Sequence, residues 1–151
     1  MDLKNITPID INFKKRVQDS FARQKFMTFI NAELIKIQPG YCEIKLPFTE
    51  SLTQQHKYFH AGIIAAIADN AAGYAAFSLM HSTSTVLTVE YKINFVAPAK
   101  GDFLVAKASV LKKGGTLIVC QAEVFAQNHS KLKLCSVMQS TLMELKNKKD
   151  S

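Results

Sequence analysis

The sequence predicts an α+β protein in which one antiparallel β-sheet is wrapped around a long central α-helix. Residues 61–80 form a run rich in alanine, and a helix over this run would be apolar on nearly every side. After it, apolar and polar residues alternate with the two-residue period of strands. Because a helix that is apolar all round must be covered on all sides, we expect the sheet on most of it and a second copy of the chain on the rest.

An amphipathic helix is expected in front of this core. Residues 11–29 place Phe13, Val17 and Phe21 four positions apart among basic residues, which is the spacing of one helical face. The expected strands, five or six in number, cover residues 32–38, 41–48, 87–95, 103–112, 116–126 and 132–145. Turns are indicated by Pro39-Gly40, which fits type II, by Gly114-Gly115 and by residues 128–130, whereas residues 50–59 fit a polar loop.

Length and charge limit the possible classes of protein. The 151 residues fit one domain: a helical segment at 1–30, the sheet-and-helix domain at 31–145, and a flexible basic tail at 146–151. The net charge of +7 favours an acidic partner such as a phosphate-bearing small molecule. Nucleic acid is not expected, since the sequence has no zinc-finger pattern and no dense arginine cluster. No signal peptide is expected, because charged residues interrupt any apolar run in the first thirty residues. No membrane segment is expected either, because Asp69, Asn70 and two glycines interrupt residues 61–80.

The cysteines and histidines give no metal-binding pattern. Cys42, Cys120 and Cys135 are odd in number and widely spaced, which fits reduced thiols in a cytoplasmic protein. The four histidines lack a metal-ligand spacing as well. We therefore expect neither a metal nor another cofactor.

Asp69 is the most informative residue of the chain. It is the one charged residue between His60 and His81, in an otherwise apolar run of small residues. On a helix, the positions three and four residues away carry alanine or glycine, so no local cation neutralises the carboxylate and open space lies above it. Because burying an unpaired charge is costly, Asp69 is a candidate functional residue. The alternative is an exposed aspartate on a solvated stripe of the helix.

Two segments resemble a known family. Gln54-Gln-His-Lys-Tyr-Phe-His-Ala-Gly, followed by Asp69, resembles the signature of hotdog-fold acyl-CoA thioesterases of the PaaI (phenylacetic acid degradation) type. In that family an Asn or Gln precedes a His-Gly-Gly turn, and an Asp follows about two helical turns later. Residues 93–101 also resemble the family's strand, which ends in a Pro-Ala motif and a glycine. The resemblance covers residues 34–142 and implies the hotdog fold, here with an additional N-terminal helix.

The resemblance implies that the protein hydrolyses an acyl-CoA thioester to a free acid and coenzyme A. Asp69 falls where these enzymes place the general base or nucleophile, and Thr88 where a hydroxyl orients the attacking water. Ala61 begins the helix, so its main-chain N–H is expected to bind the oxyanion that forms at the thioester carbonyl. Gln54 corresponds to the amide that polarises this carbonyl. No cofactor is needed for this chemistry.

Substrate contacts are expected at the start of the same helix and at one basic turn. His60 is expected to support the turn by hydrogen bonding, and Gly62 adds a second main-chain N–H at the helix start. Lys112 and Lys113 lie in a hairpin turn, where they either hold the phosphates of coenzyme A or form a solvated turn.

The resemblance also implies a homodimer or homotetramer whose sites are shared between subunits. Gln54 and Ala61 of one chain would then face Asp69 and Thr88 of the other. In residues 87–95 the odd positions are apolar and the even positions are polar, which places Thr88 on the polar side of its strand. We therefore expect Thr88 to reach Asp69 only through a local distortion of the strand or a subunit contact.

Two other functions remain open. His60 and Asp69 would fit a hydroxyacyl-thioester dehydratase on the same fold, although the His-x-x-Phe-Pro surroundings of those enzymes are absent. A non-catalytic acyl-CoA-binding protein would use the same pocket without turnover. Formation of an enoyl product, release of a thiol and binding without turnover distinguish the three functions. The sequence predicts no particular acyl group.

Overall fold

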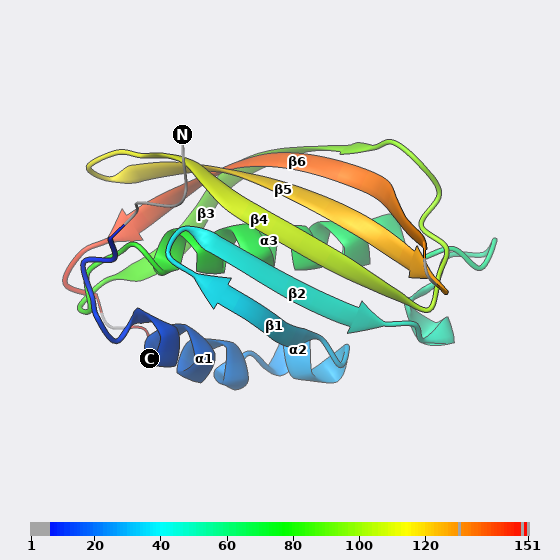
Figure 1. Cartoon of the computed structure of the whole chain (residues 1–151), viewed down its shortest axis with the longest axis horizontal. Coiled ribbons are helices and arrows are strands. Elements are labelled where there is room, and N and C mark those ends of the chain that lie inside the picture. The colour runs from blue at the N-terminus through cyan, green and yellow to red at the C-terminus, as the bar shows by residue number, and fades with distance from the viewer. Residues whose placement is uncertain (1–6, 130, 149, 151) are drawn as a thin grey trace.

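A curved sheet of six antiparallel strands wraps over one long helix (Figure 1). The structure is a computed structural model and describes residues 7–129, 131–148 and 150. The helices are α1 (Phe13–Arg23), α2 (Lys25–Phe29) and α3 (Ala61–Phe77), and a 3₁₀ turn covers Glu50–Leu52. The strands are β1 (Glu33–Gln38), β2 (Tyr41–Pro47), β3 (Thr85–Phe95), β4 (Phe103–Lys113), β5 (Leu117–Asn128) and β6 (Lys131–Leu145). Their order in the sheet is β1-β2-β4-β5-β6-β3, which confirms the predicted hotdog architecture.

Helix α3 is the centre of the core. Its small residues allow the strands to approach closely, and five of its alanines have no exposed surface: Ala68, Ala71, Ala72, Ala75 and Ala76. The predicted helix over residues 61–80 ends at Phe77. Beyond it the chain winds into a tighter turn, in which Leu79 N–H bonds to Ala76 C=O and Met80 N–H to Phe77 C=O.

The expected N-terminal helix is present but is divided at Gln24 into α1 and α2. Gln24 has an extended backbone (φ −75°, ψ 99°). Its side chain crosses to α3, where Nε2 donates to Tyr74 Oη (2.8 Å) and Oε1 accepts from Asn70 Nδ2 (2.9 Å). These tertiary hydrogen bonds accompany the break, and the helical periodicity of residues 11–29 carries no signal for them.

Strand β3 contains a bulge that changes which side chains face α3. Thr88 pairs with Leu142, whereas Tyr91 pairs with Ser140, and the register shifts between Thr88 and Glu90. Directly paired residues point to the same side of a sheet, and both Leu142 and Ser140 are fully buried. Thr88 therefore points toward the helix side. The apolar face predicted for residues 87–95 is wrong in the first half of the strand.

The consequence is an exposed apolar surface on an edge strand. β3 is the last strand of the sheet, and Leu87 and Val89 are 51% and 53% exposed. Tyr91 and Phe95, farther along β3, are also about half exposed. An exposed apolar edge of this kind is typical of a strand that pairs with another chain.

The predicted turns agree with the structure where it describes them. Gly40 has φ 72°, as a type II turn requires at that position. Gly114 N–H bonds to Leu117 C=O (2.8 Å) and closes the β4–β5 hairpin. In the turn predicted at 128–130, His129 has φ 53°, whereas Ser130 lies outside the described residues.

Candidate active site

Asp69 is half-buried in the middle of α3, and Thr88 of β3 binds it directly. Thr88 Oγ1 donates a hydrogen bond to Asp69 Oδ1 at 2.9 Å. The β3 bulge makes this contact possible within one chain, as the expected local distortion of the strand. Burial raises the pKa of the Asp69 carboxyl, and the hydrogen bond from Thr88 lowers it by a smaller amount. A poorly solvated carboxylate that keeps one ordered donor is suited to take a proton from water.

Both side chains line a pocket of about 310 Å³ between α1, α3 and β3. Its described lining includes a second carboxylate, Asp150, and neither lysine nor arginine. Among the described residues, the lining therefore offers no lysine or arginine to neutralise Asp69.

Another part of the lining is a hydrogen-bonded cluster that the sequence patterns did not predict. Ser20 Oγ lies 3.1 Å from Tyr74 Oη, which also accepts from Gln24 Nε2, and Gln24 in turn accepts from Asn70. All four residues line the pocket of Asp69. Taken one by one, polar residues on amphipathic helices indicate a solvated surface, so only the packing of α1 on α3 reveals the cluster.

At the start of α3, one main-chain donor is free. His60 is the N-cap: its Nδ1 accepts from Gly62 N–H (2.9 Å), and its carbonyl accepts from Ile63 (3.0 Å) and Ile64 (3.2 Å). His60 thus makes a hydrogen bond at the turn, whereas its expected contact with substrate stays a prediction. Ala61 N–H has no acceptor among the described residues, whereas the N–H of Gly62 is occupied. Ala61 is therefore the donor at this helix start that remains available to a ligand.

Gln54 lies beside Ala61 in a second pocket, of about 440 Å³. Its main-chain N–H bonds to Tyr58 C=O (2.9 Å), and its side-chain Oε1 accepts from His56 N–H. These bonds fix the loop, while Gln54 Nε2 has no acceptor within the described part of the chain. Ala61 and Gln54 thus give the lining of this pocket a main-chain N–H and an amide side-chain N–H, two kinds of donor that are used in oxyanion sites.

The two pairs of residues do not meet within one chain. Asp69 lies eight residues after Ala61 on α3, a separation of about 12 Å along the helix axis. Asp69 and Thr88 line one pocket, and Gln54 and Ala61 line another. Within one chain the two pairs therefore lie in two separate pockets. His60 belongs to the helix start as well, so this arrangement does not favour its pairing with Asp69 in a dehydratase site.

Lys112 and Lys113 lie at the other end of the molecule. Figure 1 shows the β4–β5 hairpin opposite the loop that precedes α3. Lys113 Nζ donates to the carbonyl of Leu79, just beyond the C-terminal end of α3 (2.7 Å), and Lys112 is exposed. Lys113 thus satisfies a carbonyl near the helix terminus. The phosphate-binding role of both lysines stays a prediction.

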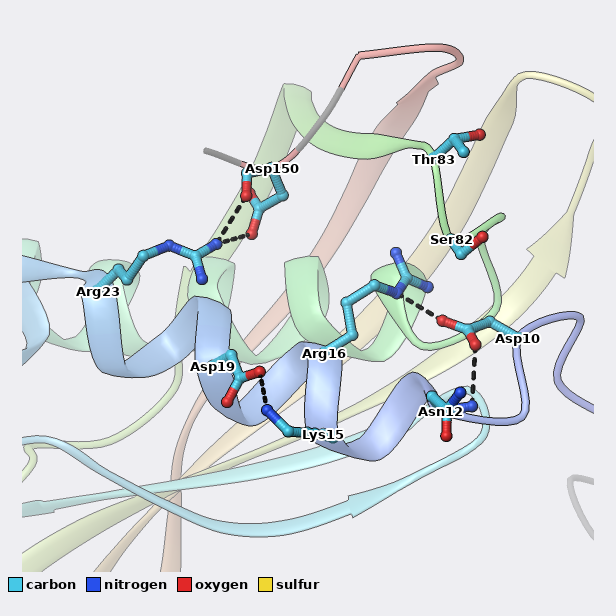
Figure 2. Close-up of a pocket in the computed structure, with 9 residues that line it drawn as sticks. All are labelled: Asp10, Asn12, Lys15, Arg16, Asp19, Arg23, Ser82, Thr83 and Asp150. Atoms are coloured by element: carbon cyan, nitrogen blue, oxygen red, sulfur yellow. Dashed lines mark hydrogen bonds and ion pairs between the residues drawn. The ribbon is translucent and has the colours of Figure 1, made fainter.

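In another pocket, of about 610 Å³, the charged side chains of the lining are already paired (Figure 2). Three basic residues of α1 that line it each form an ion pair with an aspartate, namely Lys15 with Asp19, Arg16 with Asp10 and Arg23 with Asp150. Arg16 also donates to the carbonyls of Phe77 (3.1 Å) and Met80 (2.9 Å) and so stabilises the end of α3. These contacts indicate a structural role for the basic residues.

Within residues 7–129, 131–148 and 150, no three His, Cys, Asp or Glu side chains are grouped to hold a metal ion. No helix in the same ranges is both long and apolar enough to cross a membrane.

Comparison with known proteins places the chain in a family. Residues 56–133 match the model of the thioesterase superfamily. A Saccharolobus solfataricus protein that carries an esterase name is 32% identical over 111 residues, which cover 72% of this chain and 78% of the relative. The crystal structure of a thioesterase family protein from Silicibacter pomeroyi superposes with a TM-score of 0.88 at 42% identity, covering 89% of this chain and 98% of that one.

The chain belongs to the thioesterase superfamily, and its fold and site define it as a hotdog-fold thioester hydrolase. Its fold is also that of the Escherichia coli PaaI protein from the phenylacetic acid degradation operon. That structure superposes with a TM-score of 0.80 at 19% identity, covering 89% of this chain and 94% of that one. The predicted resemblance to the PaaI type agrees with these findings.

Proposed function

We propose that the protein hydrolyses an acyl-CoA thioester to a free acid and coenzyme A, at a site shared by two subunits. The observation that carries the proposal is the hydrogen bond from Thr88 to the half-buried Asp69, in a pocket whose described lining includes neither lysine nor arginine. It supports a role for Asp69 as the reactive carboxylate, because a poorly solvated acid with a raised pKa is typical of a functional site. Oxyanion donors are the remaining requirement, and they lie on a separate part of the chain.

In the proposed reaction, Asp69 of one subunit takes a proton from water that Thr88 helps to orient, or attacks the carbonyl carbon itself. A carbon–oxygen bond forms, and the carbonyl oxygen becomes an oxyanion. Ala61 N–H and Gln54 Nε2 of the other subunit stabilise that charge. The carbon–sulfur bond then breaks, and the coenzyme A thiolate leaves and takes up a proton. When Asp69 is the nucleophile, water releases the acid from the acyl-enzyme in a second step.

The exposed apolar edge of β3 supports a dimer as the active form. Two β3 strands that pair across a two-fold axis would cover Leu87 and Val89 of both chains and extend the sheet. Such pairing brings β3, with Thr88 beside Asp69, next to the partner chain. We infer a homodimer as the smallest active unit, which a homotetramer would contain twice. The buried, unpaired Cys42, Cys120 and Cys135 support a cytoplasmic location, where thiols stay reduced.

Substitution of Asp69 tests the chemistry. Asp69→Asn keeps the size of the side chain and its acceptor for Thr88 but removes the base, and we expect kcat for the best acyl-CoA to fall about a thousandfold or more. Thiol release from short, medium, long and aryl acyl-CoAs measures the effect. Asp19→Asn, which removes an exposed acid of α1, is the control and should leave kcat unchanged. Unchanged turnover in Asp69→Asn would remove this carboxylate from the mechanism.

Substitution of Ala61 tests the main-chain donor. Ala61 is the first residue of α3, where proline is tolerated, and His60 before it is already extended (φ −63°, ψ 139°). Ala61→Pro therefore deletes one N–H with little cost to the helix. We expect kcat to fall roughly a hundredfold to a thousandfold, the usual effect of losing one oxyanion donor.

Mixing the two inactive variants tests whether the site is shared. In a mixed dimer of Asp69→Asn and Ala61→Pro chains, one site carries both lesions and the other carries neither. After the subunits are exchanged, we expect about a quarter of wild-type turnover, because half of the dimers are mixed and one site in each is intact. A site contained within one chain would show no recovery.

A further inference from the structure

A second groove lies beside the pocket of Gln54 and Ala61. It has a volume of about 540 Å³ and is lined by Phe48, Lys57, Lys100, Gly101, Asp102 and Asn128. These residues come from the loop after β2, the loop before α3, the β3–β4 connection and the end of β5. All four segments meet at the end of the molecule where α3 begins (Figure 1).

The groove and the pocket of Ala61 are direct neighbours. Lys57 and Lys100 line the groove, whereas the adjacent residues Tyr58 and Ala99 line the pocket. The two segments are joined by a hydrogen bond from Phe59 N–H to Ala99 C=O (3.0 Å). The groove and the pocket of the candidate oxyanion donors are therefore lined by neighbouring residues of the same two segments.

The groove has the side chains that a phosphorylated aromatic base requires. Lys57 and Lys100 are exposed, and neither forms an ion pair within the part of the chain that the structure describes. Phe48 is 44% exposed, and its ring packs edge-on against Phe59 at 5.5 Å, which holds it in place. Ammonium groups bind phosphates as point charges, and aromatic rings stack on bases.

The remaining lining residues leave room for such a ligand. A Cβ on Gly101 would lie 2.2 Å from the carbonyl oxygen of Gln127, so the close approach of these two backbone segments requires glycine at this position of the lining. The carboxylate of Asp102 accepts from His129 N–H (3.1 Å), which ties the one acid of the described lining to the neighbouring turn. Asn128 adds an amide with both donors and acceptors.

We propose that this groove binds the adenosine 3′-phosphate 5′-diphosphate end of coenzyme A, with Phe48 stacked on the adenine and Lys57 and Lys100 on the phosphates. The proposal rests on the proposed function and assigns the phosphate contacts to Lys57 and Lys100 instead of Lys112 and Lys113. The pantetheine arm runs from the groove into the pocket of Ala61. The thioester carbonyl then meets Ala61 N–H of the same chain and Asp69 of the other.

Kinetics with two substrates isolate the contribution of the groove to substrate binding. The substrates are an acyl-CoA and the same acyl group on N-acetylcysteamine, a thioester without a nucleotide. For Lys57→Ala combined with Lys100→Ala we expect KM for the acyl-CoA to rise about tenfold or more, with kcat unchanged, because two charge-assisted contacts are lost. KM for the truncated thioester should not change. Lys14→Ala combined with Lys25→Ala, which removes the same two charges from exposed positions of α1 and α2, is the control and should alter neither value.

Phe48 provides a test that does not depend on charge. Phe48→Tyr keeps the ring and should keep KM for the acyl-CoA, whereas Phe48→Leu should raise it about tenfold through the loss of stacking. The proposal would be overturned if KM for the acyl-CoA stays unchanged when both groove lysines are replaced but rises in Lys112→Ala. An equal rise for both substrates would also overturn it, because the groove would then act only through the shape of the pocket.

Direct binding separates failure of the groove from failure of the proposed function. Calorimetry with adenosine 3′,5′-bisphosphate needs no turnover. We expect the wild type to bind it and the double lysine variant to lose about tenfold in affinity or more. If the wild type does not bind this nucleotide, the proposal that the groove is a nucleotide site is refuted. If the wild type binds the nucleotide but hydrolyses neither thioester, the proposed function fails while the nucleotide site stands.

Discussion

Replacing Thr88 by valine removes one hydroxyl and keeps the shape of the side chain. In the wild type this hydroxyl donates to Asp69 Oδ1 at 2.9 Å and stabilises the charged carboxylate. A hydrogen bond to a charged group contributes about 1.5–3 kcal/mol, and the lower end applies here because Asp69 is only half-buried. Since one pKa unit corresponds to about 1.36 kcal/mol, the pKa of Asp69 should rise by about one unit in Thr88→Val.

The pH dependence of kcat/KM measures this shift. The proposed mechanism needs ionised Asp69, so the rate of the wild type should fall as the pH drops through the raised pKa of this carboxyl. In Thr88→Val the acid limb of the profile should move to higher pH by about one unit. The plateau should also fall roughly tenfold to a hundredfold, because the attacking water is less well oriented. Thr88→Ser keeps the hydroxyl and should retain the wild-type limb. An acid limb that stays in place or moves to lower pH in Thr88→Val would refute the reasoning.

Three further outcomes follow from the structure. Val89→Lys places a charge on the exposed edge of β3, so we expect monomers by analytical ultracentrifugation, unchanged circular dichroism and loss of turnover. Arg16→Met leaves the Asp10 carboxylate, whose side chain is 9% exposed, without its ion pair, and urea titration should show a free energy of unfolding lower by about 3 kcal/mol. Burial raises the pKa of Asp69 in the folded state, so its charge destabilises the fold once the pH exceeds the ordinary value of 3.8. Asp69→Asn should therefore raise the urea midpoint at neutral pH, and this gain should disappear below that value.

The succession of elements could be predicted because each has a strong local pattern. The two-residue period predicts the strands, the apolar run predicts α3, and Pro39-Gly40 predicts the first hairpin. The break at Gln24 could not be predicted in this way. It accompanies hydrogen bonds to Tyr74 and Asn70, about fifty residues away, which no local pattern encodes.

The candidate site, too, could be predicted from the sequence only in part. Asp69 stands out in the sequence because its surroundings lack any other charge. The orientation of Thr88 depends on a register shift between β3 and β6, and strict alternation places it on the wrong side of the strand. Which of the first N–H groups of α3 stays free depends on how the His60 ring turns, so the difference between Ala61 and Gly62 appears only in three dimensions.

The free donor at position 61 has a consequence for how this enzyme can change over time. The proposed mechanism uses only the peptide N–H of residue 61, which almost any amino acid supplies. The side chain at this position can therefore vary and widen or narrow the entrance of the pocket. Proline is the exception, because it alone removes the donor. Mutational scanning at position 61 should thus reveal variants with a shifted substrate range and intact turnover. Only the proline variant should lose turnover while the protein stays folded.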